Sequence, residues 1–291
     1  MTGRIVFRDA EGRAPGIRIT PPPFQHTWAQ HSYTRPEELV ERLRGATVAM
    51  TCSVPMRREH LEQLPDLRMI SLALTGTDIV DVDYCAERGI VVTNVPGYAA
   101  NTVAEHTLAM IFELMRRPAA YTRLMRRVHR GEAEAKNIYF DFRIRDLAGK
   151  TLGILGSGPI ARSLGDKARA LGMRTVYENR GGRLTGPEHV SLDALLATSD
   201  VVSINCPLTE ETRDLLDAGR LAQMKPDAII VNTGRGGIVN EAALIAALQA
   251  GRLGGAALDV VVNEPVRPDD PLFALIERDD FILNPHVAWS S

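Results

Sequence analysis

Short apolar runs alternate with amphipathic stretches along the first third of the chain. The apolar runs do not alternate with polar positions, and they read RIVF, TVAMTC, RMISLAL and IVVTN. Between them, the stretches RPEELVERLRG, RREHLEQLP and DVDYCAERG carry apolar residues at helical spacing. Strands of this kind, separated by helices, are typical of a parallel sheet with both faces covered. The pattern predicts an α/β layer structure for this region.

A long amphipathic stretch, NTVAEHTLAMIFELMRR, separates this region from a second alternation. Asn101 or Thr102 stands where a helix cap is expected, with Glu105 at capping-box distance from Thr102. From Thr151 onward there are six strand candidates, TLGILG, RTVYEN, VVSINC, AIIVNT, GAALDVV and FILNP, and helical stretches separate most of them. Six parallel strands joined by crossover helices are the content of a doubly wound dinucleotide-binding fold.

The first of these six runs leads directly into a glycine-rich turn. Gly156 and Gly158 flank the turn, and a helix is expected to begin near Pro159, whose missing N–H would have no partner in a first helical turn. Glycines let a pyrophosphate approach the backbone, and the helix N-terminus supplies N–H donors. Ala161 is a permitted variant at the third position of the fingerprint, and a second strand ends roughly 20 residues later. The motif predicts nucleotide binding at Gly156, Gly158, Pro159 and Ile160.

The end of the next strand, YENR, bears on the choice of cofactor. NAD-binding sites normally place an acidic residue here for the ribose hydroxyls, but the position is best assigned to Asn179, which is followed by Arg180. A neutral Asn does not repel a 2′-phosphate, and Arg pairs with one, which favours NADPH. Glu178 argues for the other cofactor, because NADH is expected if its side chain faces the ribose. The sequence leaves NAD and NADP open.

Three polar residues follow later strands of the second alternation. Arg235 comes after AIIVNTG, Glu264 after GAALDVVVN and His286 after FILNP. Ligands bind outside the carboxyl ends of the strands in an open α/β sheet, so these distant residues are able to share one site. Each also has a simpler interpretation, as a solvated loop arginine, a turn acid before proline, and a histidine near a poorly ordered end. Their shared position behind a nucleotide motif favours a common site.

Reduction of a 2-oxo acid needs this set of groups. A cation must bind the carboxylate and the carbonyl oxygen, and the planar fork of Arg235 suits that role. The oxygen that becomes a hydroxyl needs a proton donor, and His286 suits because imidazole titrates near neutral pH. A neighbouring Glu264 carboxylate would favour the imidazolium and orient the ring. The hydride would come from the cofactor.

Composition and cysteine usage exclude several other classes of protein. The 291 residues are typical of two domains, and a net charge of −2 provides no field that attracts nucleic acid or anionic lipid. Cys52, Cys85 and Cys206 form no CxxC pair, and Glu105-His106 lacks HExxH spacing, so a zinc site is not expected. No run reaches the roughly 18 apolar residues of a membrane span, and the N-terminus lacks a signal-peptide pattern. We expect a cytoplasmic protein that binds no metal, nucleic acid or membrane.

Seven stretches from about Thr75 onward occur in the order of a known family. They are TGTDIVDVD, NVPGYAANTVAEHTLAMIFEL, LAGKTLGILGSGPIA, NCPLTEETRDLL, IIVNTGRGGIVNEAALIAAL, GGAALDVVVNEP and NPHVAWSS. On these residues the chain resembles the D-isomer-specific 2-hydroxyacid dehydrogenases. HVAWSS and LTGTDIVDVD look most like the glycerate dehydrogenase, or hydroxypyruvate reductase, members of that family.

The resemblance implies roles for individual residues. Arg235 would bind the substrate, His286 would be the acid/base, and Glu264 would be its partner. The backbone N–H groups of Thr75 and Gly76 would hold the substrate carboxylate. The residues implied near the cofactor are Cys206, Pro207, Thr212, Thr233 and Asp259, of which Asp259 would meet the nicotinamide carboxamide.

The resemblance also implies an arrangement of domains. A doubly wound Rossmann cofactor domain, residues 99–285, would be inserted in a smaller flavodoxin-like parallel α/β substrate domain, residues 1–98 with 286–291. The substrate would bind in the cleft between them. In the family the chain then returns to the first domain through a C-terminal helix, which would lie beyond Ser291. Family dimer contacts fall in the arginine-rich stretch around residues 116–130, so a homodimer is expected.

We therefore expect an enzyme that reduces a small 2-oxo acid, such as hydroxypyruvate or glyoxylate, with NADPH or NADH. Two alternatives stay open, a non-catalytic NAD(H)-sensing regulator on the same fold and an inactive homologue truncated at its C-terminus. The sequence does not select the 2-oxo acid, because the shape around Ser53, Leu74 and Trp289 decides which side chain fits.

Overall fold

The structure is a computed structural model that describes residues 3–10, 19–182 and 186–290. The chain divides into two compact units, and the boundary falls between Tyr98 and Ala99. Each unit has its own sheet and its own hydrophobic core. No helix within the described ranges is long and apolar enough to cross a membrane.

The first unit is built on a five-stranded parallel sheet with the order β2-β1-β3-β4-β5. Its strands are β1 (Gly3–Phe7), β2 (His26–Gln30), β3 (Val48–Thr51), β4 (Met69–Leu72) and β5 (Val91–Thr93). This order is that of the flavodoxin-like fold, which confirms the fold predicted for this region. Strand β2 was not predicted, because HTWAQ mixes polar and apolar residues at an edge of the sheet.

Short helices connect these strands. They are the 3-10 helix η2 (Pro36–Glu38), α1 (Leu39–Leu43), α2 (Arg58–Leu61) and α3 (Val82–Glu87). Asp81 caps α3, because its carboxylate accepts the backbone N–H of Tyr84 at 3.0 Å. Leu39, Leu43, Leu61 and Ile70 are among the fully buried side chains of the core of this unit.

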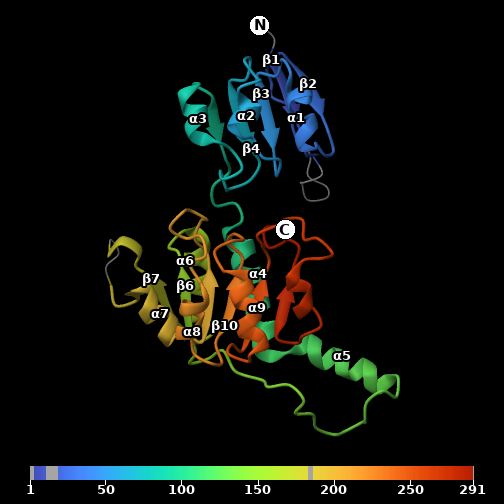
Figure 1. The fold of residues 1–291 in the computed structure, drawn as a ribbon, viewed down its shortest axis with the longest axis vertical. Helices are drawn as coiled ribbons and strands as arrows, with labels where there is room; N and C mark the ends of the chain where they lie inside the picture. The colour runs from blue at the N-terminus through green and yellow to red at the C-terminus, as the bar shows by residue number, and fades with distance from the viewer. Residues whose placement is uncertain (1–2, 11–18, 183–185, 291) are drawn as a thin grey trace. The chain divides into compact units, whose positions relative to one another are not determined.

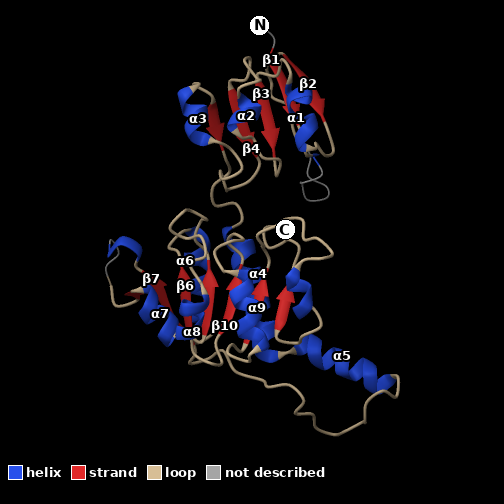
Figure 2. Cartoon of the chain, viewed as in Figure 1, coloured by secondary structure: helices blue, strands red, loops and turns tan. Residues whose placement is uncertain are grey.

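The second unit contains a seven-stranded parallel sheet with the order β12-β11-β10-β9-β6-β7-β8 (Figure 2). Its strands are β6 (Thr151–Leu155), β7 (Arg174–Glu178), β8 (His189–Val190), β9 (Val201–Ile204), β10 (Ile229–Asn232), β11 (Gly255–Leu258) and β12 (Phe281–Leu283). Read from β8, the order is 3-2-1-4-5-6 with a seventh strand added at the end, so the predicted doubly wound fold is confirmed. All six predicted strands are present, and the two-residue β8 is the one that was missed.

The second unit contains eight helical segments within the described ranges, and several of them cover the two faces of the sheet. The segments are α4 (Ala100–Arg116), α5 (Pro118–His129), α6 (Pro159–Ala170), the 3-10 helix η3 (Arg180–Gly182), α7 (Leu192–Thr198), α8 (Ala218–Gln223), α9 (Glu241–Gln249) and the 3-10 helix η4 (Pro271–Leu275). The predicted cap of α4 is wrong, because the helix already begins at Ala100 and its N-cap Ala99 has no capping side chain. Asn101 lies inside the first turn, where its amide donates to Glu105 at 2.7 Å.

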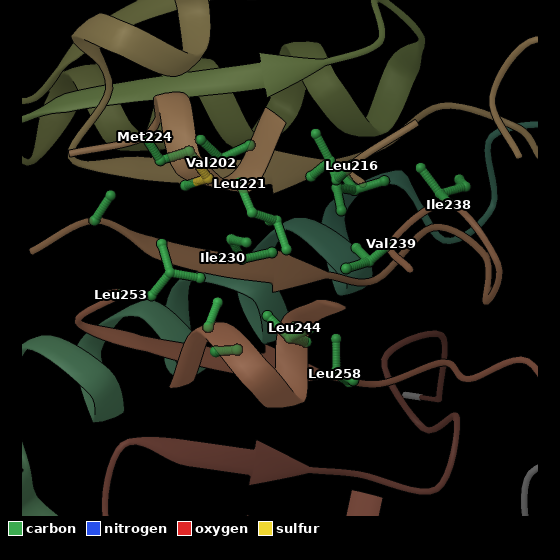
Figure 3. Close-up of a cluster of buried hydrophobic side chains, with 14 of the residues drawn as sticks. Val202, Leu216, Leu221, Met224, Ile230, Ile238, Val239, Leu244, Leu253 and Leu258 are labelled. Carbon is green, nitrogen blue, oxygen red and sulfur yellow. The ribbon is translucent and has the colours of Figure 1, made fainter. Parts of the chain in front are cut away.

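Successive residues of the central strands bury their side chains on opposite faces of the sheet. Ile230 belongs to the cluster drawn in Figure 3, with Val202 and Leu258 from the neighbouring strands and Leu221 and Leu244 from α8 and α9. Its neighbours along β10 belong to a second cluster, which includes residues of α4 and α6. Both faces of the sheet are therefore closely packed, which holds the loops at the ends of its strands in place.

Helix α5 extends away from the sheet of the second unit, and the chain returns to β6 through a long loop (Figure 1). Large apolar side chains are exposed along this segment, which comprises residues 118–149 and is called the arm below. Phe140 is 89% exposed and Ile138 is 67% exposed.

Residues 286–290 belong to the second unit, whereas the sequence analysis assigned 286–291 to the first. Backbone contacts explain the difference. Asp259 accepts the N–H of His286 through its carbonyl, and it accepts the N–H groups of Val287 and Ala288 through its carboxylate. Ala288 and Trp289 also pack with Ala99 and Val103, so this segment is held by the unit that carries β11 and β12.

Candidate active site

The carboxyl ends of β9 to β12 meet at one edge of the seven-stranded sheet. Because these strands are parallel and in register, the residues that follow them lie along the same edge. Arg235 follows β10, Asp259 and Glu264 follow β11, and His286 follows β12. The edge carries charged groups from three separate stretches of the chain, between Arg235 and His286, as expected for a ligand site on such a sheet.

Glu264 and His286 form a hydrogen-bonded pair. The ring Nδ1 of His286 lies 2.7 Å from Oε2 of Glu264, and both side chains are partly exposed. With Nδ1 engaged by the carboxylate, Nε2 is the ring nitrogen left to exchange a proton with a ligand. The structure thus brings together two of the three residues that were predicted to be catalytic.

The backbone of His286 is held in an unusual conformation. Its φ angle is +53°, in the left-handed region, which costs a non-glycine residue roughly 1–2 kcal/mol. Its N–H donates to the Asp259 carbonyl at 2.8 Å, and its own carbonyl accepts the indole N–H of Trp289 at 2.8 Å. These bonds stabilise the strained conformation, so the direction of the imidazole is set by its neighbours rather than by a flexible tail.

Several groups act on the Glu264 carboxyl. Burial alone would raise its pKa, but the hydrogen bond and charge of His286, the Val261 N–H at 3.1 Å and the charge of Arg235 outweigh burial, so the pKa lies below its ordinary value. Glu264 is therefore ionised at neutral pH. The carboxylate next to the ring holds the orientation of the imidazole through the Nδ1 hydrogen bond.

Arg235 is placed at this edge by the loop after β10. Its guanidinium donates to the Gly234 carbonyl at 2.9 Å, and its backbone carbonyl accepts the Asn232 amide at 2.9 Å. The charge of Arg235 is the smallest of the causes that lower the pKa of Glu264. The third predicted residue is therefore near the pair, although its guanidinium is not part of the hydrogen bond that joins Glu264 to His286.

The glycine turn after β6 has the space that a bound phosphate needs. Gly156 has a φ of +117°, and a Cβ there would lie 2.6 Å from the Asn205 carbonyl, so only glycine fits. A Cβ on Gly158 would meet nothing within 4 Å. Helix α6 begins next to it with Pro159 in its first turn, and the first N–H groups of this 12-residue helix have no acceptor within the helix.

One polar atom beside this turn lacks a partner. The amide Nδ2 of Asn205 is buried without a hydrogen bond among the described residues, while its Oδ1 accepts from the Ser203 hydroxyl at 2.9 Å. Unpaired buried donors are rare in native proteins and often mark a place that a ligand completes. The open Gly158, the helix N-terminus and this donor together fit a dinucleotide.

The end of β7 holds an ion pair that bears on cofactor choice. Glu178 is only 8% exposed, and Arg180 donates to both of its carboxylate oxygens, at 2.8 and 2.9 Å from Nη2. The backbone N–H of Asn179, between them, donates to the Val190 carbonyl at 2.8 Å. The guanidinium that was predicted to pair with a 2′-phosphate is therefore partly neutralised by the carboxylate that was predicted to compete with it.

The other residues predicted near the cofactor stabilise the loops of this edge. Thr212 closes the loop after β9, because its hydroxyl donates to the Pro207 carbonyl at 2.8 Å. Thr233 shares a hydrogen bond of 2.9 Å with Thr107 of α4. Cys206 is buried, and burial raises the pKa of its thiol to about 11. Ile160 packs against the cluster that contains Ala288.

Asp259 has a structural role that the sequence did not reveal. Its side chain is 1% exposed, and its two oxygens accept the N–H groups of Val287 and Ala288, each at 2.9 Å. The carboxylate thus anchors the segment that carries His286. Its implied contact with the nicotinamide carboxamide stays a prediction, since the described conformation shows the carboxylate covered by protein.

Two further polar residues lie beside this anchor. The amide of Asn284 lies 2.9 Å from Nε2 of His106, and the same ring nitrogen lies 3.8 Å from Asp259. The sequence predicted no role in the site for His106 or Asn284. Two features of the sequence could have indicated them: His106 is a polar residue among the apolar positions of α4, and Asn284 is a polar residue at a strand end, next to Pro285. Within the described ranges no cluster of three potential metal ligands occurs.

Thr75 and Gly76 lie in the first unit, in the loop that follows β4. The Thr75 hydroxyl donates to the Val95 carbonyl at 2.9 Å, and the Asn94 amide donates to the Thr75 carbonyl at 2.7 Å. The backbone N–H groups of Thr75 and Gly76 have no hydrogen-bond partner among the described residues. This loop therefore presents two available donors on a braced backbone, as binding of a carboxylate requires.

A doubly wound sheet with a glycine turn after its first strand, and a charged edge containing a Glu–His pair, defines a dinucleotide-dependent oxidoreductase domain. Comparison with known sequences gives the particular family. Residues 108–288 match the profile described as D-isomer specific 2-hydroxyacid dehydrogenase, NAD binding domain. The chain belongs to this family, and the resemblance seen in the sequence is confirmed.

Individual relatives agree with this assignment. A glycerate dehydrogenase of Methylorubrum extorquens is 41% identical over 295 residues, covering 100% of this chain and 91% of that protein. A hydroxypyruvate reductase of Blautia hydrogenotrophica is 34% identical over 265 residues, covering 89% of this chain and 80% of that protein. An NADPH-dependent glyoxylate/hydroxypyruvate reductase of Sinorhizobium meliloti superposes with a TM-score of 0.77 at 26% identity, covering 99% of this chain and 88% of that one. The protein is therefore an oxidoreductase that transfers a hydride between a nicotinamide cofactor and a 2-hydroxy acid.

Proposed function

We propose that this protein reduces a small 2-oxo acid, hydroxypyruvate or glyoxylate, to the corresponding 2-hydroxy acid. His286 is the acid that protonates the carbonyl oxygen through Nε2, and Glu264 orients the imidazole. Arg235 binds the substrate carboxylate and carbonyl oxygen. The observation that carries the proposal is the 2.7 Å Glu264–His286 pair on the sheet edge that also holds Arg235. The names of the glycerate dehydrogenase and hydroxypyruvate reductase relatives support this choice of substrate.

The cofactor proposed here is a nicotinamide dinucleotide, which supplies the hydride when bound. Gly156, Gly158 and the N-terminus of α6, with Pro159 and Ile160, hold its pyrophosphate. Both NADPH and NADH are accepted, and NADPH is favoured because the neutral Asn179 does not repel a 2′-phosphate and Arg180 lies beside it. The S. meliloti structure is described as NADPH-dependent, which supports this preference. The R180A variant is expected to raise the KM for NADPH by about 10-fold and to change the KM for NADH little. Equal effects on the two cofactors would exclude a phosphate contact.

Substrate binding involves the first unit as well. The two available backbone donors of Thr75 and Gly76 hold the substrate carboxylate together with Arg235, which also contacts the carbonyl oxygen. The residues at the same edge of the five-stranded sheet then determine which substituent the substrate can carry.

The protein is further proposed to be a cytoplasmic homodimer. The arm exposes Phe140 at 89% and Ile138 at 67%, more apolar surface than a solvated loop needs. A second copy of the chain would cover it, as the resemblance to the family implies. Light scattering coupled to size exclusion tests this directly, and a monomer at micromolar concentration would contradict it.

The proposed activity is tested by following the absorbance of reduced nicotinamide. The chain is mixed with NADPH or NADH and with glyoxylate, hydroxypyruvate, pyruvate or buffer alone. We expect turnover with hydroxypyruvate and glyoxylate, at kcat/KM values in the usual range of about 10⁴–10⁸ M⁻¹s⁻¹. Binding of dinucleotide without turnover of any 2-oxo acid would instead identify a non-catalytic regulator.

A further inference from the structure

The most unusual polar residue outside the site described above is Arg8, in the first unit. Its side chain is 0% exposed, although arginine is almost never fully buried unless it is paired. Nη2 donates to the Val54 carbonyl at 3.0 Å, but Nε and Nη1 have no hydrogen-bond partner among the described residues. Burial lowers the pKa of the guanidinium to about 10, which still leaves it charged at neutral pH.

The neighbouring carboxylate does not satisfy these donors. Asp9 is also buried, and its oxygens accept the backbone N–H groups of Cys52, Ser53 and Val54 at 2.6–3.0 Å. It also accepts the hydroxyls of Thr51 and Ser53. The charge of Asp9 stabilises that of Arg8 across space, while its lone pairs are used to hold the loop after β3.

Such an arrangement is costly unless something else completes it. A buried donor that has lost water and gained no acceptor destabilises the fold, and a charged donor does so more strongly than a neutral one. A hydrophobic side chain of similar volume would be tolerated at this position without that cost. The unpaired donors of Arg8 therefore indicate an acceptor that is not part of the described chain.

The position of Arg8 in the fold indicates what that acceptor belongs to. Arg8 directly follows β1, and its loop neighbours Cys52 to Val54 directly follow β3. The order β2-β1-β3 reverses between these two strands, and open α/β sheets bind ligands at such a reversal, outside the carboxyl ends of the strands. Thr75 and Gly76, after the parallel strand β4, lie at the same edge.

We propose that Arg8 is a specificity residue that donates a hydrogen bond to an oxygen on the carbon next to the carbonyl of the substrate. This inference rests on the proposed function, in which Thr75 and Gly76 hold the carboxylate at the same edge. Ser53 is the exposed residue of the loop in which the Val54 carbonyl accepts a hydrogen bond from the Arg8 guanidinium. The preferred substrates are then 2-oxo acids that carry a hydroxyl on this carbon, rather than those that end in hydrogen or methyl.

The chemistry predicts how strongly such substrates are preferred. A hydrogen bond from a charged donor to a buried oxygen changes affinity by roughly 10- to 100-fold. A site built to hydrogen-bond a hydroxyl also rejects the analogue that lacks it, because its own buried donors are left unpaired. Hydroxypyruvate and pyruvate differ by this one oxygen, so their ratio of kcat/KM isolates the contribution of Arg8.

The inference is tested with Arg8→Met, which keeps the length of the side chain and removes the donors. Wild-type protein should prefer hydroxypyruvate to pyruvate by at least roughly 10-fold in kcat/KM, and R8M should lose most of this preference, through a fall in kcat/KM for hydroxypyruvate that is larger than any change for pyruvate or glyoxylate. The thermal stability of R8M should equal or exceed that of the wild type. The matched control is R44M, an exposed arginine of the same unit, and it should leave the ratio unchanged.

Other outcomes overturn the inference. A structural role predicts that R8M melts at a lower temperature and loses activity with all three substrates alike. An unchanged ratio in R8M excludes a contact with the hydroxyl. If R8M fails to fold, R8Q, which retains one amide donor, replaces it in the same comparison.

A binding measurement separates this inference from the proposed function. Calorimetric titration of D-glycerate and D-lactate, in the presence of oxidised cofactor, compares the same pair of groups without turnover. If no 2-oxo acid is reduced, the proposed function fails, yet tighter binding of glycerate that disappears in R8M still supports the role of Arg8. Equal affinities for the two acids in the wild type contradict it.

Discussion

The Asp259→Asn substitution probes how the chain positions its candidate acid. Asp259 is 1% exposed, and its carboxylate accepts the N–H groups of Val287 and Ala288, each at 2.9 Å. These are the residues that follow His286, whose backbone lies in the left-handed region at a φ of +53°. Asn has nearly the same shape but only one oxygen, so one of the two N–H groups would face an amide NH₂.

The magnitudes decide the outcome. Two hydrogen bonds to a buried carboxylate contribute about 1.5–3 kcal/mol each, which exceeds the roughly 1–2 kcal/mol of strain at His286. In D259N, one neutral hydrogen bond of about 1 kcal/mol remains, and the unpaired N–H costs about 1–3 kcal/mol. The segment 286–290 should then lose at least about 3 kcal/mol of local stability, and the imidazole should leave its partner Glu264.

Hydrogen exchange and kinetics together test this reasoning. The amides of Val287 and Ala288 should exchange roughly 100-fold faster in D259N, because local opening governs their protection. The value of kcat/KM should fall by about 10²-fold or more, while Asp193→Asn, at an exposed position of α7, should change neither quantity. Wild-type protection of both amides, with kcat/KM within about twofold, would refute the anchoring role.

Two further predictions concern titrating groups. The pKa of Glu264 lies below its ordinary value of 4.5, so the stability that its pairing with His286 contributes should be fully present above pH 4.5 and lost as the pH falls through the pKa of the folded state. The melting-temperature difference between wild type and E264Q should therefore shrink below about pH 4.5. A difference that grows in acid would contradict the lowered pKa of Glu264. Because burial raises the pKa of Cys206 to about 11, only about a thousandth of this thiol is ionised at pH 8, so iodoacetamide should label it slowly in the native protein and rapidly in denaturant; equal rates in the two states would contradict its burial.

Sequence patterns predicted the fold well wherever hydrophobic periodicity was strong. The strands of the second unit are buried on both faces, so runs such as AIIVNT stand out against the helices between them. Strands β2 and β8 were missed because they lie at sheet edges and are partly exposed, so no continuous apolar run marks them. The start of α4 was misplaced because Ala99 caps nothing with its side chain.

The candidate site was predictable only in part. Arg235, Glu264 and His286 could be predicted because each follows a predicted strand and carries a charged or titratable side chain that has no obvious packing role there. The anchoring role of Asp259 was hidden, since it depends on bonds to backbone N–H groups 28 and 29 residues away, which carry no side-chain signature. The burial of Arg8 was also hidden, because an arginine next to an aspartate in sequence looks like an ordinary solvated pair.

The most direct test of the account is the comparison of wild type with H286A in single-turnover reduction of hydroxypyruvate, with cofactor affinity measured in parallel. Loss of a general acid should lower the rate by about 10²–10⁴-fold across pH 5–9, while the Kd for NADPH stays within about twofold of the wild-type value. An H286A protein that reduces hydroxypyruvate at a near-normal rate throughout this range would contradict the assignment of His286 as the acid and, with it, the mechanism built on the Glu264–His286 pair.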